Sequence, residues 1–321
     1  IRYLVRSRGL GDVYKRQVEE YADEITRLMN LTVADRRIFG GVNNDEKAFA
    51  IQKNAAGATV TYNGVPVDTY SDPNMFPQGF SSYCDIGLGM TLGADGRIDE
   101  QSALKITFNG VEATGCGKQP TTAFIDLEEI QDGVEYSFEM AIGNDGDKSE
   151  KNITFKGGKD AAETRANINA ELAKIDDLKG KVTLYEHGTI INDFNGKQVK
   201  ITDTSDVAAN GGNALSVENQ GKAYSNNIIQ SILDAAQIIR TGDGTEIARY
   251  ADHIYSLQTK VSLTLADIGN STKFIEFNQE RITNNLETLT GRQNDLESTD
   301  FPSETTTWKL SLIHISEPTR P

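Results

Sequence analysis

The side chains that most often carry catalysis or bind metal ions are few and isolated in this sequence. Three histidines (His187, His253 and His314) and two cysteines (Cys84 and Cys116) are spread over 321 residues. No H-E-x-x-H, C-x-x-C or G-x-S-x-G spacing occurs. We expect His187 and His253 to lack partners, with His253 on the polar side of a helix. The cysteines either form a disulfide or remain separate thiols.

Two short motifs could hold a phosphate or a calcium ion, and both are incomplete. The stretch GCGKQP (115–120) resembles the end of a P-loop, but Lys118 is followed by Gln119 instead of Ser or Thr, and Glu112 replaces the required glycine. The acidic loop GNDGDKSE (143–150) lacks the bidentate glutamate of a calcium loop. The sequence therefore predicts no catalytic residue, no cofactor and no metal ion, and we expect that the protein is not an enzyme.

The overall charge excludes two further classes of partner. There are 47 acidic and 32 Lys or Arg residues, a formal charge of −15 at pH 7. Nucleic-acid surfaces need clustered Lys and Arg, so we expect no nucleic-acid partner. No run of about 18 apolar residues occurs, so no membrane span or membrane partner is expected.

The two ends differ in composition from the rest of the chain. Residues 1–17 hold five basic residues and one acidic residue. Residues 310–321 break the preceding pattern in the same way. Both stretches resemble translated sequencing-adapter tails, and we expect them to be non-native. The alternative for 1–17, a basic targeting arm, lacks the apolar core of about 7–15 residues that a secretory signal needs.

A helix is predicted at the start of the native part. Apolar residues recur at three- and four-residue steps over 18–34, with acidic residues in the gaps. Gly40 and Gly41 are expected to end this helix and turn the chain outward. We expect Ile38 and Phe39 to anchor that joint in a helical core.

The middle of the chain changes to the period of β-strands. The Asn63-Gly64 pair lies between alternating apolar residues, the strongest short signal for a hairpin, because both turn positions need positive φ. Similar text at 106–113, 153–160 and 193–201 predicts further turns of the same kind.

Helical periodicity returns within and after this region. A helix is predicted over 160–175, and its apolar face is expected to contain Ala162, Ile168, Leu172 and Ile175. A second helix begins near Ala223 and is broken by Thr241–Gly244. Because so short a turn separates it from the next helical pattern, we expect these two helices to pack antiparallel.

The last segment has the clearest repeat in the chain. Aliphatic residues stand at every seventh position: Ile247, Ile254, Val261, Ile268, Ile275, Ile282, Leu289 and Leu296. This spacing predicts a long helix that packs with a slight supercoil. About half of the companion positions, four residues further on, are polar, which favours a seam with other helices, including those of neighbouring subunits. The alternative is an ordinary amphipathic core helix.

These patterns together predict an α+β fold. We expect a long antiparallel helical rod, of the coiled-coil-like bundle type, with an inserted β-rich domain. The expected ranges are 1–17 and 310–321 for the tails, 18–50 and 222–309 for the rod, and 51–221 for the insert.

Two segments resemble the flagellin superfamily, and within it the hook-filament junction proteins (the third hook-associated protein). These carry a pattern close to G-R-Y-I-F-x-G-x-x-x-D-x-x-P-F, which RRIFGGVNNDEKAF matches in register at Arg36, Ile38, Phe39, Gly41, Asp45 and Phe49. Asp35, Arg37 and Ala48 depart from it. The segment 262–300 is similar to the C-terminal helix that flagellins and junction proteins share, including Leu265, Ala266, Ile268 and Gly269.

The resemblance implies a structural subunit that joins hook to filament in the bacterial flagellum. It implies a ring of identical subunits as the assembly, with the hook-side hook-associated protein, flagellin and a flagellar export chaperone as partners. The place it implies is extracellular, reached through the flagellar type III apparatus. The terminal helices of the family are absent from this sequence, so we expect the fragment to fold but to join rings poorly. The alternatives are flagellin itself and a surface adhesion or glycan-binding module.

Overall fold

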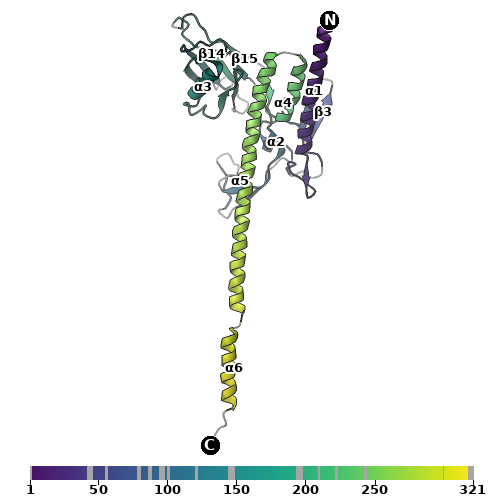
Figure 1. The fold of residues 1–321 in the computed structure, drawn as a ribbon, viewed down its shortest axis with the longest axis vertical. Coiled ribbons are helices and arrows are strands. Elements are labelled where there is room, and N and C mark those ends of the chain that lie inside the picture. Colours follow the sequence, from purple (N-terminus) through teal and green to yellow (C-terminus); the bar gives the residue numbers. More distant parts are fainter. Residues whose placement is uncertain are drawn as a thin grey trace. The chain divides into compact units, whose positions relative to one another are not determined.

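The computed structural model describes most of the chain. The described residues are 2–41, 46–54, 57–77, 81–85, 89–93, 98–99, 102–119, 122–143, 149–192, 198–208, 210–220, 223–241, 244–298 and 300–316. The chain divides into two units, Ile1–Asp267 and Ile268–Pro321. The described residues form helices and antiparallel sheets, as expected for an α+β fold (Figure 1).

The longest described helix, α5, has 54 residues; it begins in the first unit and continues into the second. The bounds of the helices are α1 (Arg2–Met29), the 3-10 helix η1 (Pro73–Met75), α2 (Gly110–Thr114), α3 (Ala161–Leu172), α4 (Ile228–Thr241), α5 (Gly244–Glu297) and α6 (Phe301–Ser316). Residues 2–17, predicted to be a non-native tail, form the first part of α1.

The strands pair only antiparallel in the part of the chain that the structure describes. One pair is β1 (Thr32–Val33) with β2 (Arg36–Arg37), and another is β6 (Tyr83–Asp85) with β7 (Ala103–Lys105). A third pair is β8 (Lys118–Gln119) with β16 (Tyr224–Ser225), and a three-stranded sheet has the order β3 (Phe49–Asn54), β4 (Gly57–Tyr62), β5 (Val65–Pro66). A second three-stranded sheet has the order β11 (Ser149–Lys156), β10 (Glu135–Ile142), β14 (Val199–Asp203). The four-stranded sheet has the order β12 (Val182–Leu184), β13 (Thr189–Asn192), β9 (Thr122–Ile125), β15 (Val217–Gln220).

The prediction that α1 continues to residue 34 and stops at Gly40-Gly41 is wrong. The helix ends at Met29, and a tight hairpin of β1 and β2 follows at once. Ala34 and Asp35 form its turn with φ of 49° and 60°. Positive φ at two non-glycine residues has no strong sequence signal, although Asp adopts this region more readily than most residues.

The Asn63-Gly64 hairpin is confirmed, whereas two of the similar stretches form other structures. Asn63 and Gly64 have φ of 47° and 82° and connect β4 to β5. At 106–113 the Asn109 side chain instead accepts a hydrogen bond from the Glu112 N–H (2.7 Å) and caps the short helix α2. At 153–160 the chain leaves β11 and enters α3, and residues 193–197 of the remaining stretch lie outside the described part.

The predicted helix over 160–175 is confirmed as α3, with Asp160 as its N-cap (Asp160 Oδ1 to Glu163 N, 2.8 Å). Ile168 and Leu172 are buried as expected. Ala162 is exposed, so its place on the apolar face was predicted wrongly, and Thr164 is buried there instead.

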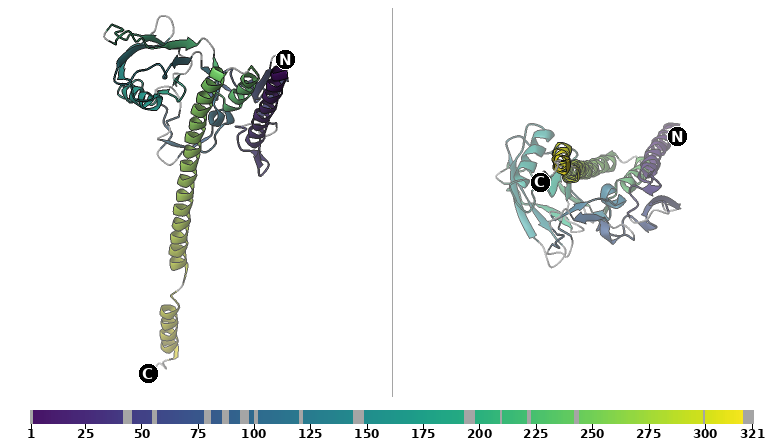
Figure 2. Two further views of the ribbon diagram at one scale, coloured as in Figure 1. Left: turned by 45° about the horizontal axis from the view of Figure 1, so that its top comes forward. Right: turned by 90° about the horizontal axis from the view of Figure 1, so that it is seen from below.

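The main β core, which we call the insert core, joins α3 to the four-stranded sheet and to the sheet of β10, β11 and β14. Its most deeply buried side chains include Phe138, Met140, Ile153, Ile168 and Ile190. Figure 2 shows α3 lying against the strands of this region. Large apolar residues alternate inward along β10, as a half-buried strand requires.

A second core, the joint core, brings both ends of the first unit together. Ala22 of α1 and Ile229 of α4 pack with Phe49, Tyr62 and other residues of β3, β4 and α2. The side chain of Gln230 on α4 continues this contact, because it accepts from Val60 N (2.8 Å) and donates to Ala58 O (3.1 Å). The residues of 51–221 therefore contribute to two cores.

The helix closest to α4 is α1, which lies alongside it (Figures 1 and 2). α4 also meets α5 through a small core of Tyr224, Ala235, Ile238 and Tyr250. The expected packing of α4 against α5 is thus limited to this small core. Beside it, an apolar groove lies between the two helices.

Candidate assembly surface

The groove between α1, α4 and α5 receives the first members of the seven-residue repeat. Its volume is about 820 Å³. Ile247 and Ile254 line it from α5, with Ile232 and Ile238 from α4 and Ile25 from α1. Such an apolar groove between helices has the chemistry to receive another apolar helix face.

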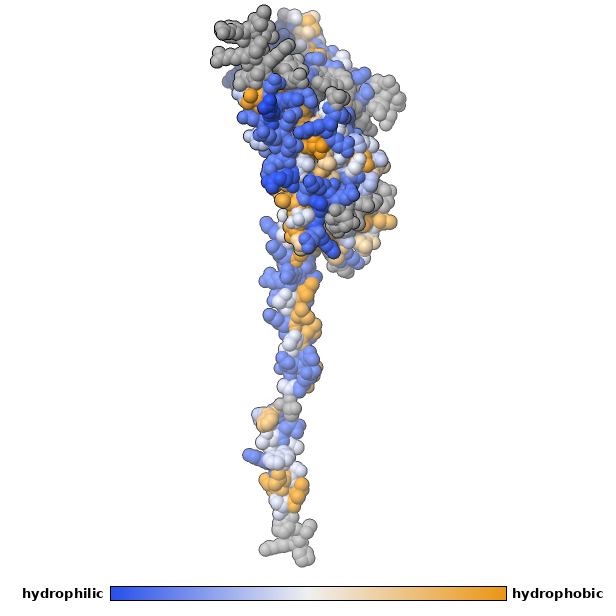
Figure 3. All heavy atoms as spheres, turned by 90° about the vertical axis from the view of Figure 1, so that its right-hand side faces the viewer, coloured by the Kyte–Doolittle hydropathy of each residue, from blue (hydrophilic) through white to orange (hydrophobic). Residues whose placement is uncertain are grey.

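In the second unit the later members of the repeat lie open to solvent. Ile275 is 43% exposed, Ile282 56%, Leu289 59% and Leu296 88%. Figure 3 shows apolar atoms gathered along one side of this part of α5. A coiled-coil bundle therefore remains a prediction, since these side chains have the spacing of a seam but are not covered.

The backbone of α5 has no neighbouring atoms beside two of its glycines. A Cβ placed at Gly269 or Gly291 would meet no atom within 4 Å. Glycine inside a helix costs about 1 kcal/mol relative to alanine. The helix is nevertheless continuous through both positions.

The stretch RRIFGG does not anchor a helical core in the way that was predicted. Ile38 is 45% exposed. Phe39 is half-buried, and its carbonyl accepts hydrogen bonds from Tyr62 Oη (3.1 Å) and Gly110 N (3.1 Å). Gly41 has a φ of 65°, which favours glycine. The stretch therefore reaches the joint core through the backbone of Phe39.

Of five aromatic residues scattered between positions 62 and 83 that could form a glycan platform, three are used in the joint core. Tyr62 and Phe76 are buried with ring centroids 5.8 Å apart, and Tyr70 packs on Phe76 at 5.3 Å. Of the other two, Phe80 lies outside the described residues and Tyr83 is partly exposed on β6. This region therefore presents no open platform formed by these three described rings.

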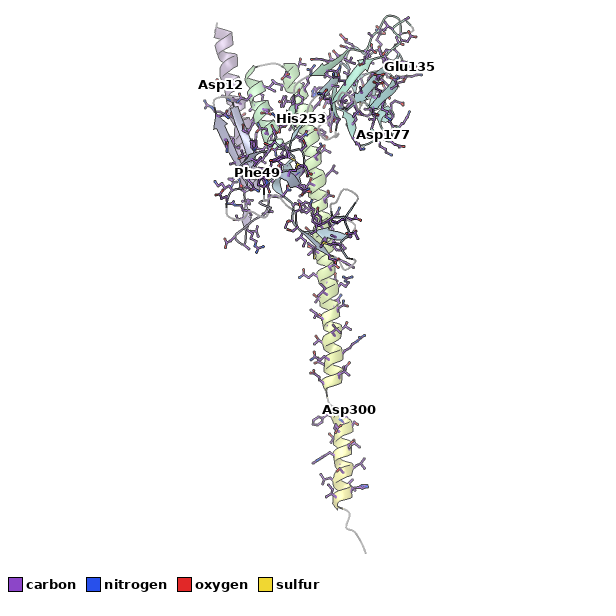
Figure 4. The ribbon with its side chains drawn as sticks, turned by 180° about the vertical axis from the view of Figure 1, so that it is seen from behind. Asp12, Phe49, Glu135, Asp177, His253 and Asp300 are labelled. Atoms are coloured by element: carbon purple, nitrogen blue, oxygen red, sulfur yellow. The ribbon has the colours of Figure 1, made fainter. Side chains whose placement is uncertain are left out.

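Both histidines of the first unit have partners, contrary to expectation. His187 donates its backbone N–H to Asp252 Oδ2 (3.0 Å), and its Nδ1 lies 2.9 Å from Oδ1 of the same carboxylate. His253 is fully buried rather than on the polar side of α5, and its Nε2 donates to Ser225 O (2.7 Å) (Figure 4). These pairs are separated by 65 and 28 residues, so no local spacing could have indicated them.

The remaining candidates for chemistry do not converge. Cys84 and Cys116 are free thiols, and burial raises the pKa of the Cys116 thiol to about 12. Among the described residues, no group of three or more His, Cys, Asp and Glu side chains could hold a metal ion. Residues 144–148 of the acidic loop lie outside those residues. None of the described helices has the length and apolar character needed to cross a bilayer.

Comparison with known proteins returns distant likenesses only. No protein-family model and no curated protein matches the chain. The crystal structure of flagellar hook associated protein-3 from Legionella pneumophila is 11% identical over 90% of this chain and 82% of that chain, with a TM-score of 0.40. Xanthomonas campestris FlgL is 13% identical over 88% of this chain and 86% of that chain, with a TM-score of 0.31.

Proposed function

We propose that this chain is a structural subunit of the bacterial flagellum that joins the hook to the filament. The observation that carries the proposal is the row of uncovered aliphatic residues on α5, from Ile275 to Leu296. About 25 cal/mol is gained for each Å² of apolar surface removed from water, so a row of four such residues favours contact with another helix. The resemblance of 35–49 and 262–300 to hook-filament junction proteins supports the flagellar assignment.

The proposed assembly is a ring of identical subunits that meets the hook-side hook-associated protein and flagellin. The subunit would act outside the cell after export through the flagellar type III apparatus, with a dedicated chaperone. No catalytic role is part of this proposal. Flagellin itself is the nearest alternative, and it would use the same helical surface along the whole filament.

The location of the protein in the source bacterium separates these functions. Gold-labelled antibody against residues 122–220 is expected at the single point where hook meets filament, and deletion of the gene is expected to leave hooks without filaments. Labelling along the entire filament would assign the chain to the flagellins. Normal flagella after deletion would contradict both assignments.

A single aspartate on the repeat should abolish this assembly. Ile282→Asp, introduced into the chromosomal gene of the source bacterium, is expected to reduce swimming in soft agar to the level of the deletion strain. Covering a charge in an apolar seam costs several kcal/mol, about 3 or more. Because Ile282 is 56% exposed, far-UV circular dichroism of the purified variant should show unchanged helix content.

The matched control is Asn284→Asp on the same helix. Asn284 is exposed, and two residues correspond to about 200° around a helix, so this aspartate lies on the opposite face. Asn284→Asp is expected to swim like the wild type. If the two variants swim equally well, the seven-residue repeat is not part of the assembly surface.

A further inference from the structure

A polar cavity of about 500 Å³ lies between α3, the connection from β12 to β13, and α5. Figure 1 shows the region that contains α3 beside the N-terminal part of α5. The polar side chains of its lining are Arg165, Asn169, Tyr185, Glu186, His187, Asp252 and Tyr255. All belong to the first unit, and none is part of the repeat on α5 beyond residue 268.

Arg165 is the side chain in this cavity that is always positively charged. It is partly buried, and it forms no ion pair or hydrogen bond through its side chain with the described residues. A planar guanidinium presents its N–H groups in a fork that matches a carboxylate. In a chain with a formal charge of −15, this guanidinium is the permanent positive charge in the lining of the cavity.

Two carboxylates line the same cavity: Glu186 is exposed, and Asp252 is buried and already engaged. Asp252 is 4% exposed and accepts two hydrogen bonds from His187, one from the backbone and one from the ring. Asn169 is similarly fixed, since its amide accepts from Leu184 N (2.8 Å) and donates to Leu184 O (2.9 Å). These bonds hold the wall of the cavity in place and leave the Arg165 guanidinium without a carboxylate partner among the described residues.

Two tyrosines form an aromatic corner of the cavity. The rings of Tyr185 and Tyr255 have centroids 6.1 Å apart and an interplanar angle of 74°. Neither hydroxyl forms a hydrogen bond with the described residues, and burial raises the pKa of Tyr185, which keeps that hydroxyl protonated. Aromatic side chains of this kind combine an apolar face with a polar edge.

We propose that this cavity binds a pyranose sugar that carries a carboxylate. Arg165 pairs with the carboxylate, and the rings of Tyr185 and Tyr255 pack against the apolar C–H groups of the sugar. The tyrosine hydroxyls and Nε2 of His187, whose Nδ1 is held by Asp252, bond to its hydroxyl groups. This binding activity is separate from the assembly role proposed for α5.

Titration of the full chain with methyl β-D-glucuronide tests this proposal, followed by ligand-observed NMR. A ligand of this size is expected to bind with a dissociation constant on the order of 1 mM. Methyl β-D-glucoside, which has the same ring without the carboxylate, and acetate, which has only the carboxylate, are each expected to bind at least about tenfold more weakly. Binding of the glucoside or of acetate as tight as that of the glucuronide would overturn the proposal, as would no glucuronide binding up to about 20 mM.

Variants locate the binding at this cavity. Arg165→Gln and Tyr255→Ala are each expected to weaken glucuronide binding by about tenfold or more. Lys179→Gln removes the same charge at an exposed position outside the cavity and is expected to leave binding unchanged. If Arg165→Gln does not fold, as judged by circular dichroism, Arg165→Lys keeps the charge without the fork and is expected to bind several-fold more weakly. Wild-type affinity in the folded Arg165 variant would show that the sugar binds elsewhere and would refute the proposed site.

Discussion

Replacing Gly115 with alanine should destabilise the first unit by about 4 kcal/mol, within a range of roughly 2–6 kcal/mol. Gly115 follows α2 with φ of 84° and ψ of 162°, a region that only glycine occupies readily. Alanine in such a conformation costs about 1–3 kcal/mol. A Cβ at this position would also lie 2.0 Å from the carbonyl oxygen of Asn226, so one of the two backbones has to move.

The backbone opposite Gly115 has little freedom to move. Asn226 N donates to Gly117 O (2.8 Å). The side chain of the neighbouring Asn227 donates to Gly115 O (2.8 Å) and accepts from Ile229 N and Gln230 N at the start of α4 (3.1 Å each). Relieving the overlap therefore disrupts the cap of α4 as well as the joint core, and forced overpacking adds about 1–3 kcal/mol to the backbone strain.

Urea unfolding followed by circular dichroism measures this loss. Gly64→Ala is the matched control, since Gly64 has a φ of 82° in the hairpin of the same core but a Cβ there would meet no atom within 4 Å. The control is expected to lose only about 1–2 kcal/mol from the backbone conformation. Similar losses in both variants would show that the contact with Asn226 relaxes at little cost.

Acidification from pH 6.5 to about pH 4 should remove roughly 3 kcal/mol of stability through His253 alone. Burial lowers the pKa of His253 to about 4, against the opposing effect of its hydrogen bond to Ser225 O. The bond to a carbonyl requires the proton on Nε2, and the buried Nδ1 has no partner among the described residues. The ring stacks on Tyr224 at 5.2 Å, so a second proton would be placed in largely aromatic surroundings.

The sign of the effect follows from the unfolded state. An unfolded histidine has a pKa of about 6.5 and takes up a proton between pH 6.5 and 4, whereas the folded His253 does not. The contribution is therefore complete above pH 6.5 and falls by about 1.4 kcal/mol per pH unit as the pH decreases. Carboxylates titrate in part of the same range, so the wild type alone does not isolate this residue.

His253→Gln isolates it, because its amide N–H can still donate to Ser225 O and it does not titrate. The free energies of unfolding from urea titrations at pH 7 and pH 4.5 are expected to differ by about 2 to 3 kcal/mol more in the wild type than in the variant. The same pH dependence in both proteins would place the acid sensitivity elsewhere in the chain.

Local patterns in the sequence were sufficient for several elements. The Asn63-Gly64 turn was predictable because both residues tolerate positive φ, and α3 because Asp160 caps a helical period. The repeat from Ile247 to Leu296 predicted a long helix, and α5 is that helix. Turn chemistry, capping and period depend on neighbours along the chain, so one sequence is enough to read them.

Other features depended on which residues meet in space. The sequence of 106–113 resembles that of the Asn63-Gly64 hairpin. Asn109 nevertheless caps α2, whose Gly110 N donates to Phe39 O. In the cavity site, the sequence supplied the types of Arg165 and Tyr255, but their approach to His187 requires α3 and α5 to lie beside the insert strands.

The sequence by itself determined the long amphipathic helix, the hairpin and α3, because their signals are local. Only the tertiary structure decided that His253 is buried, that His187 contacts Asp252, and that Ile275 to Leu296 are uncovered. Burial and pairing depend on contacts between residues far apart in the chain. The physical reason is that a period identifies an apolar face but not the surface, if any, that covers it.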